Sequence, residues 1–235
     1  KNISDDLDLV IYSAAVTDEN PELIEARLKQ IRTLSRKEAL PIILGDKKNY
    51  CVTGAHGKST TTAILATILQ SSALIGAISK EFGSNFRYVD KTVAFEADES
   101  DASFLLSNPY CAIVTNAEPE HMEYYHYDYD KFYESYETFL SLAKKRVVNG
   151  EDKDIQKLKI EDATYLYPSK DIKNLCYTLK DGQPCTKFDL KDYGTFEVWG
   201  FGFHIASNAS LAIMAALNEL DIETIRKNLL NYKGI

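Results

Sequence analysis

Apolar and polar positions follow two different periods along the first part of the chain. Short apolar runs predict strands, and the segments that follow them carry the start signals of helices. The predicted strands and helices cover, in chain order, 7–12, 21–28, 31–34 and 36–40. Asn20 before Pro21 is an N-cap with proline at the first helical position, and Ser35 with Glu38 is a capping-box pattern. Alternating strands and helices predict a parallel sheet covered by helices.

The same alternation continues after a polar, turn-rich joint at 45–49, which is a predicted domain boundary. The predicted strands cover 50–53, 93–95, 111–115 and 146–149, and the predicted helices 58–70, 130–142, 207–220 and 222–232. Residues 151–200 contain short Tyr- and Thr-rich runs between polar turns, which indicates an irregular or antiparallel region. The fold class is therefore predicted to be α/β. About 45 residues are too few for a complete domain of this kind, so the first segment is predicted to be the end of a longer domain.

Composition narrows the class of protein. A chain of 235 residues, 45% hydrophobic, can bury one large core or one domain plus part of another. Its net charge of -8 argues against a nucleic-acid-binding protein, and it lacks the roughly 20-residue apolar run of a membrane span. The four cysteines have no metal-binding spacing, and those in the predicted strands, Cys51 and Cys111, are expected to be buried free thiols of a cytoplasmic protein. The polar N-terminus does not look like a signal peptide, and without an initial Met the chain is expected to be part of a longer protein.

The strongest chemical signal is a glycine-containing loop between a predicted strand and a predicted helix. Glycines allow a tight turn with inward N–H groups, and the helix N-terminus favours an anion, so this loop predicts phosphate binding. Lys58 would reach the terminal phosphates, and the Ser59 hydroxyl would ligate Mg²⁺. The alternative is a chance GKS in a glycine-rich turn. The candidate nucleotide-binding residues here are Gly54, Ala55, His56, Gly57, Lys58, Ser59 and Thr60.

Residues 53–62, TGAHGKSTTT, resemble the phosphate loop of the Mur ligases, usually GTxGKTTT or GTHGKTTT. His56 is typical of the alanine-adding branch of that family. Ala55 and Ser59 depart from the usual threonines, although serine still offers a hydroxyl to Mg²⁺. The resemblance implies a central parallel-sheet ATPase domain with a P-loop, preceded by the tail of a Rossmann-like domain.

Four acidic residues lie within six positions after a predicted strand, in the string FEADESDASF at 95–104. Considered alone, such a run is a solvated acidic loop. The string is similar to the signature of the alanine-adding branch, and this resemblance implies that Glu96 binds Mg²⁺. Glu99 and Ser100 are then expected to contact substrate, while Asp98 and Glu99 could instead orient the outer shell of the ion.

The string TNAEPEHME at 115–123 also follows a predicted strand and is similar to the family string TNIExDHxD. The resemblance implies that His121 binds a second Mg²⁺, with Asn116 and Glu118 as substrate-binding companions. Considered alone, His121 would be a half-buried surface histidine. A zinc pair with His126 is rejected because no Cys or further His stands at ligand spacing.

The string GFHIASNA at 202–209 is similar to the family string GxHNxxNAxAA, with Ile205 in place of the usual Asn. The resemblance implies that Asn208 contacts adenine and places His204 at the histidine of the family. An amide side chain can pair with both the amino group and a ring nitrogen of adenine. The alternative is that Asn208 is a helix N-cap.

The two ends of the chain extend the resemblance to almost all of its residues. Residues 10–16 and 20–22 resemble the closing part of the N-terminal UDP-binding domain of the family, and 232–235 resemble the start of the hinge FxGxxRR. The resemblance therefore implies that 1–47 end the UDP-substrate-binding domain and that 48–235 form the central ATP-binding domain. The C-terminal amino-acid-binding domain is expected to lie outside this chain.

The resemblance implies an ATP-dependent ligase of peptidoglycan synthesis, acting in cell-wall biogenesis, cell shape and cell division. ATP would phosphorylate the lactyl carboxylate of UDP-N-acetylmuramate, and L-alanine would attack the acyl phosphate. Lys58, Glu96 and His121 are the implied catalytic residues, with Ser59 joining Glu96 and His121 in binding Mg²⁺. The protein is expected to be a cytoplasmic monomer or homodimer without nucleic-acid or membrane partners, and this chain alone is expected not to ligate.

Three other functions stay open at this point. A murein tripeptide recycling ligase or a folylpolyglutamate-type synthetase shares the phosphate loop, although the ESDAS continuation argues against both. A nucleotide-binding module would bind ATP without substrate-dependent turnover. An unrelated P-loop kinase would normally carry the longer GxxxxGK[ST] loop.

Overall fold

The computed structural model describes residues 2–13, 15–89 and 91–235. Lys1 of the polar N-terminus and Ala14 of the segment 10–16, both used in the sequence predictions, lie outside the described residues. The chain divides into two compact units, Lys1–Gly45 and Asp46–Ile235, which are described separately. None of the helices in the described residues is long and apolar enough to cross a membrane.

The first unit is a short α/β segment. Its elements are β1 Leu9–Tyr12, α1 Pro21–Leu28, β2 Arg32–Ser35 and α2 Arg36–Leu44. β1 and β2 pair in parallel. Asn20 caps α1 by accepting the backbone N–H groups of Glu22 and Leu23, and Ser35 with Glu38 forms the predicted capping box. α2 continues four residues beyond the predicted end, where its buried Leu44 adds a further apolar contact.

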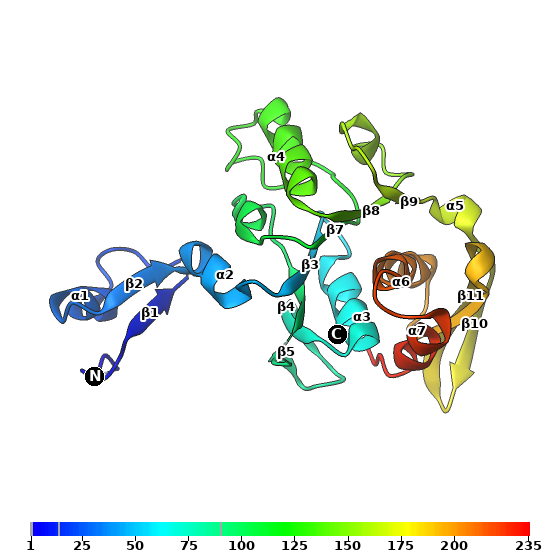
Figure 1. The fold of residues 1–235 in the computed structure, drawn as a ribbon, viewed down its shortest axis with the longest axis horizontal. Coiled ribbons are helices and arrows are strands. Elements are labelled where there is room, and N and C mark those ends of the chain that lie inside the picture. The colour runs from blue at the N-terminus through cyan, green and yellow to red at the C-terminus, as the bar shows by residue number, and fades with distance from the viewer. Residues whose placement is uncertain (1, 14, 90) are drawn as a thin grey trace. The chain divides into compact units, whose positions relative to one another are not determined.

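The second unit contains, in the described residues, a seven-stranded sheet in the order β5-β4-β6-β3-β7-β8-β9 (Figure 1). Its strands are β3 Lys48–Thr53, β4 Ser72–Ser79, β5 Ser84–Arg87, β6 Thr92–Glu96, β7 Cys111–Val114, β8 Lys145–Asn149 and β9 Thr164–Leu166. Every pairing is parallel except that of β4 with β5. The predicted α/β class with a mostly parallel sheet is confirmed.

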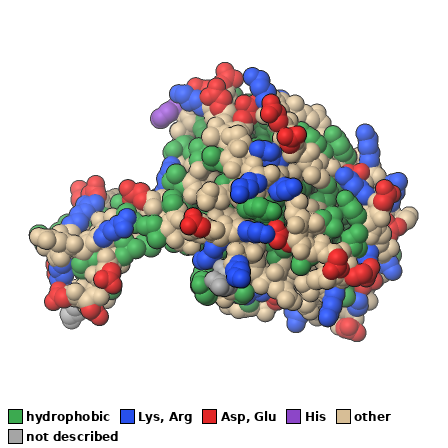
Figure 2. Space-filling view, viewed as in Figure 1, with side chains coloured by type: hydrophobic (Ala, Val, Ile, Leu, Met, Phe, Trp, Pro, Cys, Tyr) green, Lys and Arg blue, Asp and Glu red, His purple; other side chains and the backbone are tan. Residues whose placement is uncertain are grey.

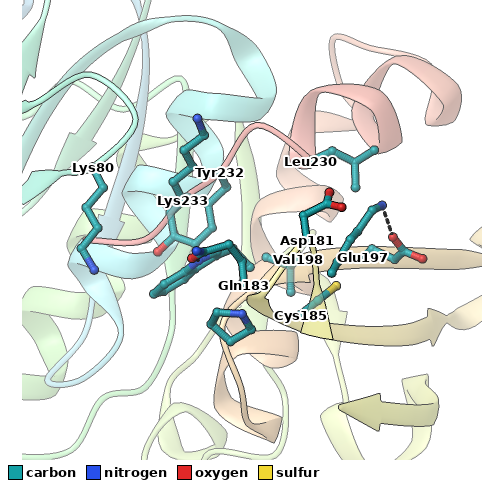
Figure 3. A pocket seen from close by; sticks show the side chains of 12 residues that line it. Lys80, Asp181, Gln183, Cys185, Glu197, Val198, Leu230, Tyr232 and Lys233 are labelled. Carbon is teal, nitrogen blue, oxygen red and sulfur yellow. Dashed lines mark hydrogen bonds and ion pairs between the residues drawn. The ribbon is translucent and has the colours of Figure 1, made fainter. Parts of the chain in front are cut away.

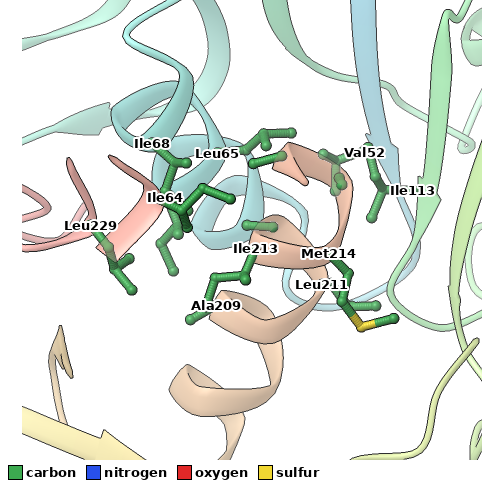
Figure 4. Close-up of a cluster of buried hydrophobic side chains, with 14 of the residues drawn as sticks. Val52, Ile64, Leu65, Ile68, Ile113, Ala209, Leu211, Ile213, Met214 and Leu229 are labelled. Carbon is green, nitrogen blue, oxygen red and sulfur yellow. The ribbon is translucent and has the colours of Figure 1, made fainter. Parts of the chain in front are cut away.

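Two helices form the centre of the core beside this sheet. The helices of the unit are α3 Lys58–Leu69, α4 Tyr129–Leu142, α5 Pro168–Asp171, α6 Phe203–Ala216 and α7 Ile222–Leu229. Ile64 and Leu65 of α3 and Ile213 of α6 are fully buried in one apolar cluster (Figure 4). From Thr61 to Ile68, α3 is buried on every side, which is why this part carries apolar residues and threonines all round rather than one polar face.

A second, antiparallel sheet covers the other side of α6 (Figure 1). Its strands are β10 Ile172–Lys180, β11 Gln183–Leu190 and β12 Thr195–Trp199. This matches the antiparallel alternative predicted for 151–200. The remaining strand of that region, β9, instead joins the large sheet beside β8.

The structure also differs from the predicted elements in two unpredicted strands and in the bounds of the last two helices. β4 and β5 were not predicted, and β4 reads SALIGAIS, in which small residues and a central glycine give a weak strand signal. α6 begins at Phe203 rather than Ser207, with Gly202 as its N-cap, so the N-cap interpretation of Asn208 is wrong. α6 and α7 also end earlier than predicted, at Ala216 and Leu229.

Candidate functional site

The sequence strings singled out above meet at one edge of the large sheet. β3, β6 and β7 are adjacent parallel strands, so their carboxyl ends lie side by side. The phosphate loop follows β3, the acidic segment follows β6, and the segment beginning at Thr115 follows β7. This edge is the usual ligand-binding position of an open α/β sheet.

The two glycines of the loop allow it to lie directly against its neighbours. Gly54 has φ +130°, and a Cβ there would lie 2.6 Å from the carbonyl oxygen of Asn116. Gly57 has φ +85°, and a Cβ there would lie 2.7 Å from Oδ1 of Asn208. Both positions therefore require glycine for space as well as for backbone conformation.

The Asn116 side chain forms two hydrogen bonds with the backbone in the middle of the loop. Its Oδ1 accepts the backbone N–H of His56 at 3.2 Å, and its Nδ2 donates to the carbonyl oxygen of His56 at 2.8 Å. The Thr115 hydroxyl donates to the same carbonyl oxygen at 2.6 Å. Both backbone groups of His56 are thus hydrogen-bonded by the two residues that follow β7, which fixes the loop without a ligand. Asn116, predicted to contact substrate, has this structural contact in addition.

Lys58 stands at the first position of α3 and points back across the loop. Its Nζ donates to the carbonyl oxygen of Gly54 at 2.6 Å and to Oε1 of Glu99 at 3.0 Å. The Glu99 side chain is only 2% exposed, and its Oε2 accepts the Thr53 hydroxyl at 3.1 Å. Glu99, predicted to contact substrate, is therefore a buried partner of the loop lysine in this structure.

Ser59 and Glu96 form a second pair at this edge. The Ser59 hydroxyl donates to Oε1 of Glu96 at 2.9 Å, and the backbone N–H of Gly76 donates to Oε2 at 2.6 Å. A Cβ on Gly76 would lie 2.8 Å from Glu96 Oε1. Gly76 was missed from the sequence, although a lone glycine within a strand is a signal of close approach by another group.

A hydroxyl and a carboxylate at this distance are the hard oxygen donors that Mg²⁺ prefers. No group of three or more His, Cys, Asp or Glu residues placed to hold a metal ion is present within the described ranges. The Ser59–Glu96 pair therefore fits an ion that takes its other ligands from phosphate oxygens and water, as Mg²⁺ usually does.

His121 lies in the loop after β7 with φ +54° and an exposed side chain. The buried side chains of Met122 and Tyr125 anchor this loop, and the Tyr125 hydroxyl donates to the backbone oxygen of Glu99 at 2.6 Å. Burial raises the pKa of Tyr125 to about 12, so this hydroxyl stays a donor at neutral pH. The structure thus connects the histidine loop to the acidic segment through Tyr125.

The remaining predicted residues are His56, Glu118, His204, Asn208 and Ser100. The His56 imidazole lies 3.6 Å from a Glu120 oxygen and 3.9 Å from a Glu118 oxygen. His204 and Asn208 are four residues apart on α6, so they project from one side of that helix. Ser100 is held in the acidic segment by its backbone N–H, which donates to Oδ1 of Asp98 at 2.9 Å.

A cavity of about 670 Å³ lies elsewhere, beside the antiparallel sheet (Figure 3). Trp199, Tyr232 and Lys80 line it together with the β10–β11 hairpin, and none of the predicted site residues does. A second cavity of about 600 Å³ includes Glu118 and Lys157 in its lining. Basic and acidic side chains are interspersed on the face shown in Figure 2.

Comparison with known families and curated proteins gives a consistent result. The Mur ligase middle domain matches residues 52–216. The UDP-N-acetylmuramate–L-alanine ligase of Campylobacter curvus is 58% identical over 98% of this chain and 53% of that protein, and the Helicobacter pylori ligase of the same name is 53% identical over 97% and 51%. The chain thus spans about half the length of the curated relatives it matches.

Solved structures show the same fold. The UDP-N-acetylmuramate–alanine ligase of Thermotoga maritima superposes with a TM-score of 0.80 at 26% identity, covering 97% of this chain and 55% of that one. A UDP-N-acetylmuramate:L-alanyl-γ-D-glutamyl-meso-diaminopimelate ligase from Neisseria meningitides superposes with a TM-score of 0.73 at 21% identity, covering 97% and 79%. The second likeness is one of fold alone.

Proposed function

The chain belongs to the Mur ligase family, and from that premise we propose that it is the ATP-binding part of a ligase that joins L-alanine to UDP-N-acetylmuramate. The observation that carries the proposal is the sheet edge at which Lys58 and Ser59 of the phosphate loop each face a carboxylate from the acidic segment. The curated relatives of that name, 58% and 53% identical over nearly the whole chain, support this choice within the family.

ATP is proposed to bind with its phosphates over the loop 54–60. The backbone N–H groups there and the N-terminus of α3 favour an anion, and Lys58 would contact the terminal phosphates. The adenine end is proposed to lie at His204 and Asn208. The close approach of Asn208 to Gly57 supports this, because it puts that amide beside the phosphate loop.

Mg²⁺ is proposed to be held by Ser59 and Glu96, with a second ion at His121. When bound, Mg²⁺ would supply positive charge that offsets the repulsion between the γ-phosphate and the substrate carboxylate. Ser59 and Glu96 are already oriented toward one another at 2.9 Å, and Gly76 holds the second oxygen of that carboxylate. The chain would therefore need little rearrangement to present these two oxygens to an ion.

The proposed reaction has two steps. An oxygen of the lactyl carboxylate attacks the γ-phosphorus, the bond to ADP breaks, and an acyl phosphate forms. The amine of L-alanine then attacks the acyl carbon, inorganic phosphate leaves with the bonding pair, and the nitrogen loses a proton. Lys58 would stabilise charge on the transferred phosphoryl group, and Asn116, Glu118, Glu99 and Ser100 are proposed to orient the sugar nucleotide.

The two units are proposed to belong to different domains of the whole ligase. Residues 1–47 would be the closing part of the UDP-substrate-binding domain and 48–235 the central ATP-binding domain. The L-alanine site would then lie in a further domain of the whole protein. We propose that the enzyme works in the cytoplasm, in peptidoglycan synthesis, as a monomer or homodimer.

The test is phosphate release by the full-length protein with ATP and Mg²⁺, with UDP-N-acetylmuramate and L-alanine added singly and together. Release is expected only when both are present, to be abolished by Lys58→Ala, and to be unchanged by Lys180→Ala, whose exposed ion pair lies in the antiparallel sheet. The 235-residue chain alone is expected to bind ATP without release.

The other outcomes identify the other functions. Release that requires a muramyl tripeptide or a folate would assign a sister ligase. Release that ignores both substrates would leave a plain nucleotidase and contradict the proposal.

A further inference from the structure

The ammonium group of Lys58 already has a full set of acceptors within the protein. Its Nζ donates to the Gly54 carbonyl oxygen at 2.6 Å, to Glu99 Oε1 at 3.0 Å and to the Ala55 carbonyl oxygen at 3.4 Å. An ammonium group has three N–H bonds, so no donor is left over for a phosphate. A phosphate that binds Lys58 must therefore take the place of one of these acceptors.

Glu99 is the only charged acceptor among the three, and its position is fixed from several sides. Its Oε2 accepts the Thr53 hydroxyl at 3.1 Å, and its backbone oxygen accepts the Tyr125 hydroxyl at 2.6 Å. The side chains of Lys58 and Glu99 are 18% and 2% exposed, so water screens their attraction poorly. The carboxylate is therefore a preformed anion beside the phosphate loop.

The neighbouring acids of the same segment do not share this arrangement. Oδ1 of Asp98 accepts the backbone N–H of Ser100, and Oδ1 of Asp101 accepts that of Ser103. These are local turn contacts of the segment with itself. The acidic run thus contains one residue that faces the phosphate loop lysine and two that shape the turn.

We propose that Glu99 is an internal counter-anion for Lys58, which the phosphates of the nucleotide must displace, so that Glu99 sets the nucleotide affinity of the loop. The inference rests on the proposed function because it assumes that Lys58 binds nucleotide phosphate. Breaking the buried pair leaves Glu99 with only the Thr53 hydroxyl, and part of the binding free energy is consumed in doing so. Nucleotide affinity is therefore lower than the loop alone would give.

The direction in which one substitution changes the ATP affinity distinguishes this role from one in which Glu99 only positions Lys58. Glu99→Gln keeps the size of the side chain and its hydrogen bond with Thr53 but removes the charge that competes with phosphate. Displacement by nucleotide predicts tighter ATP binding. A role in which Glu99 holds Lys58 in its productive position predicts weaker ATP binding.

The experiment is calorimetric titration of the 235-residue chain with ATP in the presence of Mg²⁺. Glu99→Gln is expected to lower the Kd for ATP about tenfold, the change expected when a hydrogen bond to a charged group no longer has to be broken. Asp101→Asn removes a charge two positions further on and keeps an oxygen for the backbone N–H of Ser103, so its Kd is expected to stay within about twofold. An unchanged or raised Kd for Glu99→Gln would overturn the inference.

A second comparison tests whether the effect passes through Lys58. In the Lys58→Met background there is no ammonium to release, so Glu99→Gln is expected to lower the Kd clearly less than tenfold, by no more than the loss of one repelling carboxylate gives. A tightening as large as in the wild-type background would overturn the inference. Lys58→Met alone could fail to fold, whereas the double variant Lys58→Met/Glu99→Gln has no unpaired carboxylate. In that case the ATP affinity of the double variant is compared with that of Glu99→Gln. Equal affinities would contradict the inference. If Lys58→Met folds and binds ATP as the wild type does, the phosphate role of Lys58 in the proposed function fails instead.

Discussion

Two ion pairs in the second unit show how differently similar groups behave at its two sheets. Lys58 and Glu99, at the carboxyl edge of the parallel sheet, are 3.0 Å apart with side chains 18% and 2% exposed. Lys180 and Glu197, in the antiparallel sheet, are closer at 2.7 Å but 53% and 30% exposed. Distance alone would rank the second pair as the stronger one. Burial reverses the order, because water and salt screen the exposed pair and leave the buried one nearly unscreened.

The same contrast holds for glycines of positive φ in the two regions. Gly54 has φ +130°, and its neighbours from β7 fill the space that a side chain would take. Gly182, in the β10–β11 turn, has φ +74° and open space around it. At Gly54, glycine is required both for the backbone conformation and for space. At Gly182 it is favoured for the backbone conformation alone. The difference separates a preorganised site from an ordinary hairpin.

The largest effect is expected from alanine at these two glycines. Gly54→Ala should lower the free energy of unfolding by about 3 kcal/mol or more, because the new Cβ has both a disfavoured φ and a clash with backbone atoms. Gly182→Ala should lower it by only about 1 kcal/mol, for the φ alone. Urea unfolding of both variants measures the difference. Similar losses would mean that the packing of the phosphate loop against β7 is not tight.

The two lysines should differ by a comparable amount. Lys58→Met is expected to destabilise the chain by about 3–5 kcal/mol because it leaves the buried Glu99 carboxylate without its cation. Lys180→Met is expected to change stability by about 0–1 kcal/mol, since its pair is exposed. Adding Glu99→Gln to Lys58→Met should recover most of the loss. Equal effects in denaturant titrations of the two single variants would remove the distinction between the regions.

The smallest effect concerns thiol reactivity in the two sheets. Burial raises the pKa of Cys51 in β3 to about 12 and also raises that of Cys111 in β7, so neither forms thiolate near pH 8. Cys176, on the edge strand β10, is exposed. A thiol-reactive chromophore at pH 8 should therefore label Cys176 quickly and Cys51 and Cys111 only after unfolding. The Cys51→Ser and Cys111→Ser variants identify which signal is lost, and rapid labelling of either in the native chain would contradict the burial.

Much of the fold could be predicted because its signals lie in contiguous residues. The strand, glycine loop and helix at 50–69 and the capping box at Ser35 depend on neighbours a few positions away. The family could be predicted for the same reason, because its motifs are unbroken strings. The match of the Mur ligase middle domain to residues 52–216 confirms that prediction. β4 was not predicted, because its own residues have only a weak strand preference. Pairing with β6 makes this segment a strand.

The site divides in the same way. The sequence indicated which residues gather near the phosphate loop, and the metal, catalytic and substrate roles assigned to them stay predictions. Asn116 and Glu99 could not be recognised as partners of the loop, because they reach it from the segments that follow other strands, β7 and β6. The approach of Gly76 to Glu96 likewise depends on β4 lying beside β6.

The sequence by itself determined the glycine loop between a strand and a helix, the order of most strands and helices, and the family to which the chain belongs. These properties follow from local backbone preference and from apolar periodicity, which act over a few residues. Only the tertiary structure decided that one acid of the cluster, Glu99, is buried and paired with Lys58. Asp98 and Asp101 instead accept backbone hydrogen bonds within the turn. That choice depends on which strands are neighbours and on how far each carboxylate is removed from water, and neither is a property of the segment in which the residue stands.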